Sequence, residues 1–114
     1  MIEDSSATSL SSITSKITCS GRQQIKIGGS AKTFTVAYYD DENQEITGYE
    51  PGSWALSIDG TLVPNNLVEL TSSEDNFKLK VKFLGDDSYI GKILTITNSS
   101  GDVVASLDIE IIAL

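Results

Sequence analysis

Apolar and polar residues alternate along much of this chain with a period of two residues, not the 3.6 residues of a helix. The segment NFKLKVKF, residues 76–83, shows the pattern most plainly. Its apolar residues occupy the odd-numbered positions and its lysines the even-numbered ones, which we call the two parities of a strand. The apolar residues are Phe77, Leu79, Val81 and Phe83, and the lysines are Lys78, Lys80 and Lys82. Because strand side chains alternate between the two faces of a sheet, the segment predicts a strand with a buried apolar face and a solvent-facing lysine face.

The same alternation recurs between turn signals along the rest of the chain. A first strand is expected over residues 16–20, resuming at 24–27 after a break at Gly21. Further strands are expected within residues 32–40, 53–58, 92–98 and 103–114. Residues 61–70 are less regular, and Pro64 restricts them to a sheet edge or a bulge. About seven short strands and no helical segment predict an all-β, immunoglobulin-like antiparallel β-sandwich, with a barrel as the main alternative.

The pattern also predicts the core and the domain boundary. The expected core residues are Trp54, Phe34, Val36, Leu56, Leu79, Val81, Leu94 and Ile96. Residues 5–15 hold eight Ser or Thr among eleven, a composition that buries too little apolar surface to order the chain. Residues 1–13 are therefore expected to form a flexible linker, and residues 14–114 the immunoglobulin-like domain.

The cysteine content excludes one feature of antibody-type domains, the disulfide between the two sheets. Antibody-type domains bury a tryptophan on the third strand against an inter-sheet disulfide. Cys19 is the single cysteine of the chain, so no internal disulfide can form. Aliphatic residues such as Val36 and Ile96 are expected in its place, and Cys19 is expected to be a small core residue instead of a reactive thiol.

Composition narrows the possible functions. Sixteen acidic and eight basic residues give a net charge of −8, which argues against nucleic acid as a partner. The chain has no histidine, the commonest general base and metal ligand. No stretch approaches the roughly 20 apolar residues of a membrane span, and the acidic start is unlike a signal peptide. We expect a soluble, non-enzymatic domain with no cofactor and no membrane insertion.

Three segments together resemble a known family. IKIGGSAKTFTVAYYD, SWALSIDG and IGKILTITNSSGDVVASLDIEII are similar to bacterial immunoglobulin-like (Big-type) domains, especially those at the C-terminus of structural proteins in tailed phages and prophages of Gram-positive bacteria. The run from Gly28 to Thr35 is the most specific part.

The resemblance implies a non-enzymatic accessory domain on the virion surface, attached to an upstream virion structural domain and adhering weakly to a cell-surface glycan or protein. A repeat of a bacterial cell-surface protein, acting as a stalk, spacer or adhesin, is the alternative. A small calcium-dependent hydrolase or lectin is a third.

Two acidic turns are the candidate calcium-binding sites of such a hydrolase or lectin. The turn from Asp40 to Glu45 could hold calcium, and Asp86 and Asp87 could complete the site. An EF-hand loop needs glycine at its sixth position, where Ile46 stands when counting from Asp41. A solvated hairpin tip is the simpler interpretation, and no metal-binding or catalytic residue is assigned.

Two tyrosines and the three lysines are the candidate ligand-binding residues: Tyr39, Tyr49, Lys78, Lys80 and Lys82. Exposed tyrosine rings can stack on sugars, although packing at strand ends also explains them. Tyr89 is expected to serve as a structural tyrosine corner. The sequon at Asn98 is interpreted as a turn.

The lysine stripe has two explanations. Outward lysines discourage association between sheets, because a second such face would be repelled, and Glu69 is the best candidate for a facing acid. Alternatively, the stripe binds teichoic acid or another anionic glycan.

Overall fold

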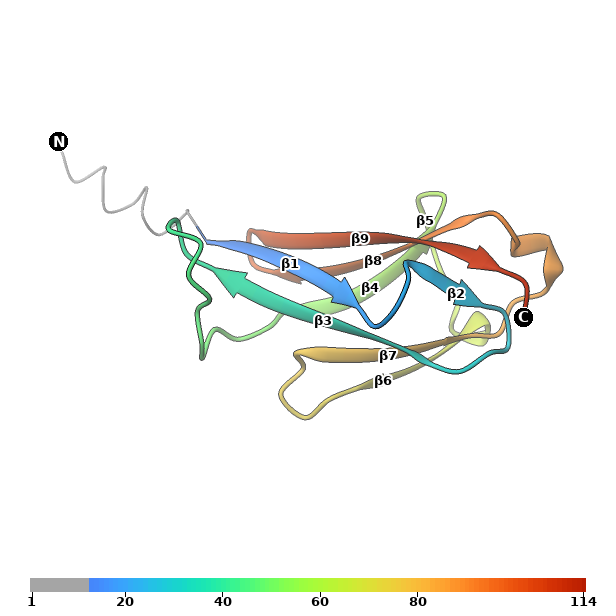
Figure 1. Cartoon of the computed structure of the whole chain (residues 1–114), viewed down its shortest axis with the longest axis horizontal. Coiled ribbons are helices and arrows are strands. Elements are labelled where there is room, and N and C mark those ends of the chain that lie inside the picture. The colour runs from blue at the N-terminus through green and yellow to red at the C-terminus, as the bar shows by residue number, and fades with distance from the viewer. Residues whose placement is uncertain (1–12) are drawn as a thin grey trace, which may run out of the picture.

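A computed structural model describes residues 13–114, and residues 1–12 of the predicted linker lie outside the described part. Nine strands and two short 3₁₀ helices are found in residues 13–114 (Figure 1). The strands are β1 (Thr14–Cys19), β2 (Gln24–Lys26), β3 (Lys32–Tyr39), β4 (Ser53–Ile58), β5 (Thr61–Leu62), β6 (Val68–Ser72), β7 (Lys78–Phe83), β8 (Ile93–Ser100) and β9 (Val103–Ile112). The 3₁₀ helices are η1 (Asn65–Leu67) and η2 (Asp87–Tyr89).

The strands form two sheets that pack face to face. One has the order β1-β3-β7-β6 and the other the order β2-β9-β8-β4-β5. These orders correspond to the A-B-E-D sheet and the G-F-C sheet of immunoglobulin domains. All paired strands are antiparallel except β2 and β9, which are parallel. The predicted immunoglobulin-like β-sandwich is confirmed.

The strand count exceeds the expected seven for two physical reasons. The first strand leaves its sheet after Cys19 and resumes in the opposite sheet at Gln24, so it counts as two strands. Gly21 permits this switch because its φ of +70° is costly for a residue with a side chain. The second extra strand is β5, which forms a two-residue hairpin arm with β4 through the Asp59-Gly60 turn.

The predicted alternation of apolar and polar residues determines which side chains form the core. Every predicted core residue except Trp54 is buried: Phe34, Val36, Leu56, Leu79, Val81, Leu94 and Ile96. On β7, Leu79, Val81 and Phe83 point into the sandwich, whereas Lys78 and Lys80 are exposed and Lys82 is half-buried. The orientation of β7 is therefore as predicted, although Phe77, which precedes the strand, is only half-buried.

Trp54 is a correction to the predicted core. It lies near the start of β4 and is half-buried, packing against the edge of the core. Its indole N–H donates a hydrogen bond of 3.0 Å to the carbonyl of Asn76, in the connection between β6 and β7. Because the polar edge of the ring needs this partner, the side chain covers the end of the sandwich instead of filling its centre.

Asn98 is a second correction, because it belongs to β8 and not to a turn. It continues the inward parity of Leu94 and Ile96 and is fully buried. Its Oδ1 accepts a hydrogen bond of 2.8 Å from the Tyr38 hydroxyl and one of 3.2 Å from the Gly52 N–H. Its Nδ2 donates to the Gly52 carbonyl at 3.2 Å. These bonds offset the cost of burying an amide.

Tyr89 lies in η2, between β7 and β8, where a tyrosine corner was expected. Its ring packs edge-on against Phe83, with ring centroids 5.5 Å apart. Within residues 13–114 its hydroxyl makes no hydrogen bond, so the residue contributes packing and not the hydroxyl contact of a tyrosine corner.

Gly52 generates the first prediction. A Cβ at this position would overlap the carbonyl of Ser99 on β8 and would separate Gly52 from Asn98. Gly52→Ala should therefore lower the free energy of unfolding by about 3 kcal/mol or more, measured by urea denaturation. Gly48→Ala is the control, because its φ of +84° adds strain but no atom lies within 4 Å of the new methyl. It should cost about 1–2 kcal/mol, and an equal or larger loss than at Gly52 would contradict the packing argument.

Tyr38 generates the second prediction. Burial raises the pKa of its hydroxyl above the usual value of 10.0. The ionised form is thus disfavoured in the folded state, so stability is full below the unfolded pKa and is lost as pH rises toward the folded pKa. Wild type should lose more unfolding free energy between about pH 9 and pH 11 than Tyr38→Phe does. Equal declines in wild type and Tyr38→Phe would show that Tyr38 does not titrate on unfolding.

Candidate anion-binding surfaces

The basic residues of this acidic chain are unevenly distributed. Four of the eight lie on the outer face of the four-stranded sheet: Lys16, Lys78, Lys80 and Lys82. Three others, Arg22, Lys26 and Lys32, line one pocket. Lys92 lies elsewhere and pairs with Asp59 at 3.4 Å. The fold therefore builds two separate cationic surfaces.

The first surface is the outer face of β1-β3-β7-β6, which we call the basic face. Besides the four lysines, the strands of this face present five threonines, one alanine, one tyrosine and one acid: Thr14, Thr18, Thr33, Thr35, Thr71, Ala37, Tyr39 and Glu69. A second acid, Glu45, is bridged to Tyr39 at the edge of the face. Lys78 lies opposite Thr35, and Lys80 lies between Thr33 and Thr71. Successive lysines on β7 are about 7 Å apart, because each residue adds about 3.3 Å to a strand.

Little negative charge compensates these lysines. Glu69 lies directly opposite Lys82, as expected, but no ion pair between them is present in the described structure. In the connection that precedes β7, Asp75 accepts hydrogen bonds from the Ser73 hydroxyl at 2.7 Å and the Phe77 N–H at 3.1 Å. The Ser73 bond chiefly holds the pKa of Asp75 below its usual value, and the charge of Lys78 adds a smaller effect. The three lysines of β7 thus remain available to an external anion.

The two candidate tyrosines are not brought together. Tyr39 belongs to the basic face, where the ammonium of Lys16 lies 5.4 Å from its ring centroid. Tyr49 instead packs on Tyr38, which points between the sheets, with ring centroids 4.4 Å apart. Both tyrosines are half-buried. Tyr39 therefore remains a candidate for ligand stacking beside the lysines, whereas Tyr49 has a structural contact that explains its position.

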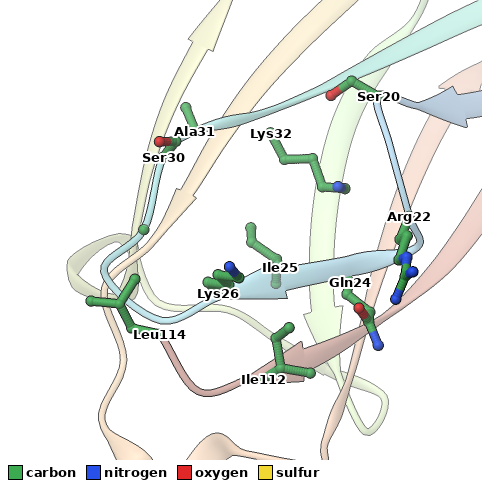
Figure 2. Close-up of a pocket in the computed structure, with 11 residues that line it drawn as sticks. Ser20, Arg22, Gln24, Ile25, Lys26, Ser30, Ala31, Lys32, Ile112 and Leu114 are labelled. Carbon is green, nitrogen blue, oxygen red and sulfur yellow. The ribbon is translucent and has the colours of Figure 1, made fainter.

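The second surface is a pocket of about 440 Å³ where the chain passes from β1 to β2 and from β2 to β3 (Figure 2). We call it the basic pocket, because its lining includes Arg22, Lys26 and Lys32 and no acidic side chain of the described chain. This pocket was not predicted from the sequence. A signal was present, since Lys32 shares the inward parity of Phe34 and Val36.

The acidic turns use their carboxylates to hold the backbone. Asp40 Oδ1 accepts hydrogen bonds from the N–H groups of Glu42 and Gln44, both at 2.9 Å. Asp86 accepts from the hydroxyl and the N–H of Ser88, and the hydroxyl bond chiefly lowers the pKa of Asp86. In the part of the chain that is described, no three potential metal ligands cluster. These hydrogen bonds explain the acidic residues as groups that stabilise the turns.

No model of a known protein family matches this chain, and no curated protein matches it. No helix within residues 13–114 is long and apolar enough to cross a membrane.

Proposed function

We propose that this chain is a non-catalytic immunoglobulin-like accessory domain that adheres weakly to an anionic polymer of a cell surface through its basic face. One observation carries the proposal. A chain with a net charge of −8 places four lysines on the outer face of a single sheet. Strand pairing within residues 13–114 places two acids on that face, Glu69 opposite Lys82 and Glu45 opposite Tyr39.

The net negative charge does not oppose local binding. Exposed charges are screened over about 8 Å at physiological ionic strength, so acids on other faces act weakly at this surface. The regular spacing of the lysines along β7 suits a linear polymer that carries repeated negative charges. Threonine hydroxyls beside Lys78 and Lys80 add hydrogen-bonding groups, and the Tyr39 ring adds a flat surface. Because all these groups are exposed or half-buried, the affinity of one domain is weak.

The resemblance to phage and prophage immunoglobulin-like domains supports display on a virion surface, with an upstream virion structural domain as the covalent partner. A repeat of a bacterial cell-surface protein, serving as a spacer or adhesin, is the second candidate. The described chain enters β1 at one end of the sandwich and leaves β9 near the other (Figure 1). That arrangement supports the second candidate, since it suits domains joined end to end.

The third prediction tests adhesion through the basic face. Lys78, Lys80 and Lys82 are replaced together by glutamine, and binding to immobilised poly(glycerol phosphate) is measured. Wild type should bind, and its binding should weaken steeply as salt rises from about 0.05 M to about 0.5 M, because salt screens exposed charges. The triple variant should lose binding and remain folded, since outward side chains that are exposed or half-buried contribute little to stability.

Replacing the same three lysines by arginine is the matched control and should preserve binding, because the positive charges remain. The opposite pattern is unchanged binding by the glutamine variant together with faster aggregation. That result would show that the lysines serve to prevent association between sheets, and it would refute the adhesive role.

A further inference from the structure

The basic pocket is a second, independent feature, and its central residue is Lys32. This lysine begins β3 on the parity that points between the sheets, the parity of Phe34, Val36 and Tyr38. It pairs in register with Val81, which is completely buried. The side chain can point inward because β1 leaves the sheet after Cys19, and this opens the sandwich edge beside β3.

Lys32 is half-buried there without an acidic partner in residues 13–114. Figure 2 shows its side chain reaching from β3 toward the turn that precedes β2. A Cβ on Gly21 in that turn would lie 3.7 Å from the Lys32 ammonium. A cation held inward at the edge of a sandwich is costly unless an anion or ordered water compensates it.

Two further cationic residues line the same pocket from other parts of the chain. Arg22 follows Gly21 in the turn, and Lys26 ends β2. Neither forms an ion pair within the described chain. Ser30 and Ala31 also line the pocket, and the N–H group of neither residue donates a hydrogen bond to an acceptor among residues 13–114. The pocket therefore combines three positive charges with unused hydrogen-bond donors.

We infer that the basic pocket binds the phosphate group of a small phosphate monoester. Three cationic side chains in one pocket lining favour a dianion over a singly charged carboxylate, because every cation that reaches the ligand gains a charge-assisted hydrogen bond. Arginine offers paired N–H groups to phosphate oxygens, and lysine adds point charge. Ile25 and Ile112 supply an apolar wall for the organic part of the ester. This site is distinct from the basic face and does not depend on the adhesive function.

The test is a nuclear magnetic resonance titration of the isotope-labelled chain with glycerol 3-phosphate at low ionic strength. Saturable amide shifts should cluster at residues 20–22 and 30–32. Lys32→Gln and Arg22→Gln should each weaken binding about tenfold or more, the loss expected for one hydrogen bond between charged groups. Binding should also weaken between about pH 7.5 and pH 5, because the ester loses its second charge near pH 6 whereas lysine and arginine stay protonated.

Lys78→Gln is the matched control, since it removes a lysine from the basic face, and it should leave the titration unchanged. Spectra of the variants without ligand show whether each remains folded, and Lys26→Gln provides a further pocket variant. No saturable shift up to about 50 mM ligand, far above a millimolar Kd, would overturn the inference. Equal binding of acetate or of a glycerophosphodiester would overturn the assignment to a monoester. Neither outcome would bear on polymer binding by the basic face.

Discussion

The buried hydrogen bond between Tyr38 and Asn98 is the contact on which the arrangement of the two sheets depends. Tyr38 lies on β3 and Asn98 on β8, which correspond to strands B and F of an immunoglobulin domain. Antibody domains connect this same pair of strands by a disulfide, which a chain with one cysteine cannot form. Here a hydrogen bond of 2.8 Å between fully buried groups joins the sheets instead. A buried polar pair tolerates few alternative packings, because each partner is costly to leave unpaired.

The contact between Tyr38 and Asn98 also fixes the register of β3, the strand that contributes residues to both cationic surfaces. β3 is an inner strand of its sheet and carries Tyr38 near its end. Its outward threonines lie beside the lysines of β7, and its first residue, Lys32, reaches into the basic pocket. A shift of β3 by one residue would exchange its inward and outward side chains. It would remove Tyr38 from Asn98, withdraw Lys32 from the pocket and expose Phe34.

The fold could be predicted from sequence because period-two alternation is a local signal. It specified which side chains of β7 are buried and which strands bracket each turn, and Pro64 and Gly21 marked the irregular positions correctly. The Tyr38–Asn98 pair could not be predicted, since it joins residues 60 positions apart. Asn98 lies in a polar segment of the sequence, which is typical of a turn. Only the folded structure shows that its amide is buried and paired with Tyr38. Trp54 was placed too deep because parity gives the direction of a side chain, not the depth of the core at that end.

Of the two candidate sites, one could be predicted from the sequence and the other could not. The lysine stripe was visible as alternation within one strand, and the predicted facing acid, Glu69, lies in register with Lys82. The basic pocket joins residues of one turn and two strands, so only the fold shows that they share a cavity. Lys32 carried a signal that was overlooked, namely a charged residue on an otherwise apolar parity. Tyr49 had no such signal, because its packing on Tyr38 depends on the course of the connection between β3 and β4.

A double-mutant cycle on Tyr38 and Asn98 tests the central claim most directly. The free energies of unfolding of wild type, Tyr38→Phe, Asn98→Ala and the double variant are measured by urea denaturation. If the hydrogen bond holds the sheets together, the double variant should be more stable than the sum of the single losses predicts, by about 1–2 kcal/mol. Additivity within about 0.5 kcal/mol would show that the two residues act independently, and it would contradict the account.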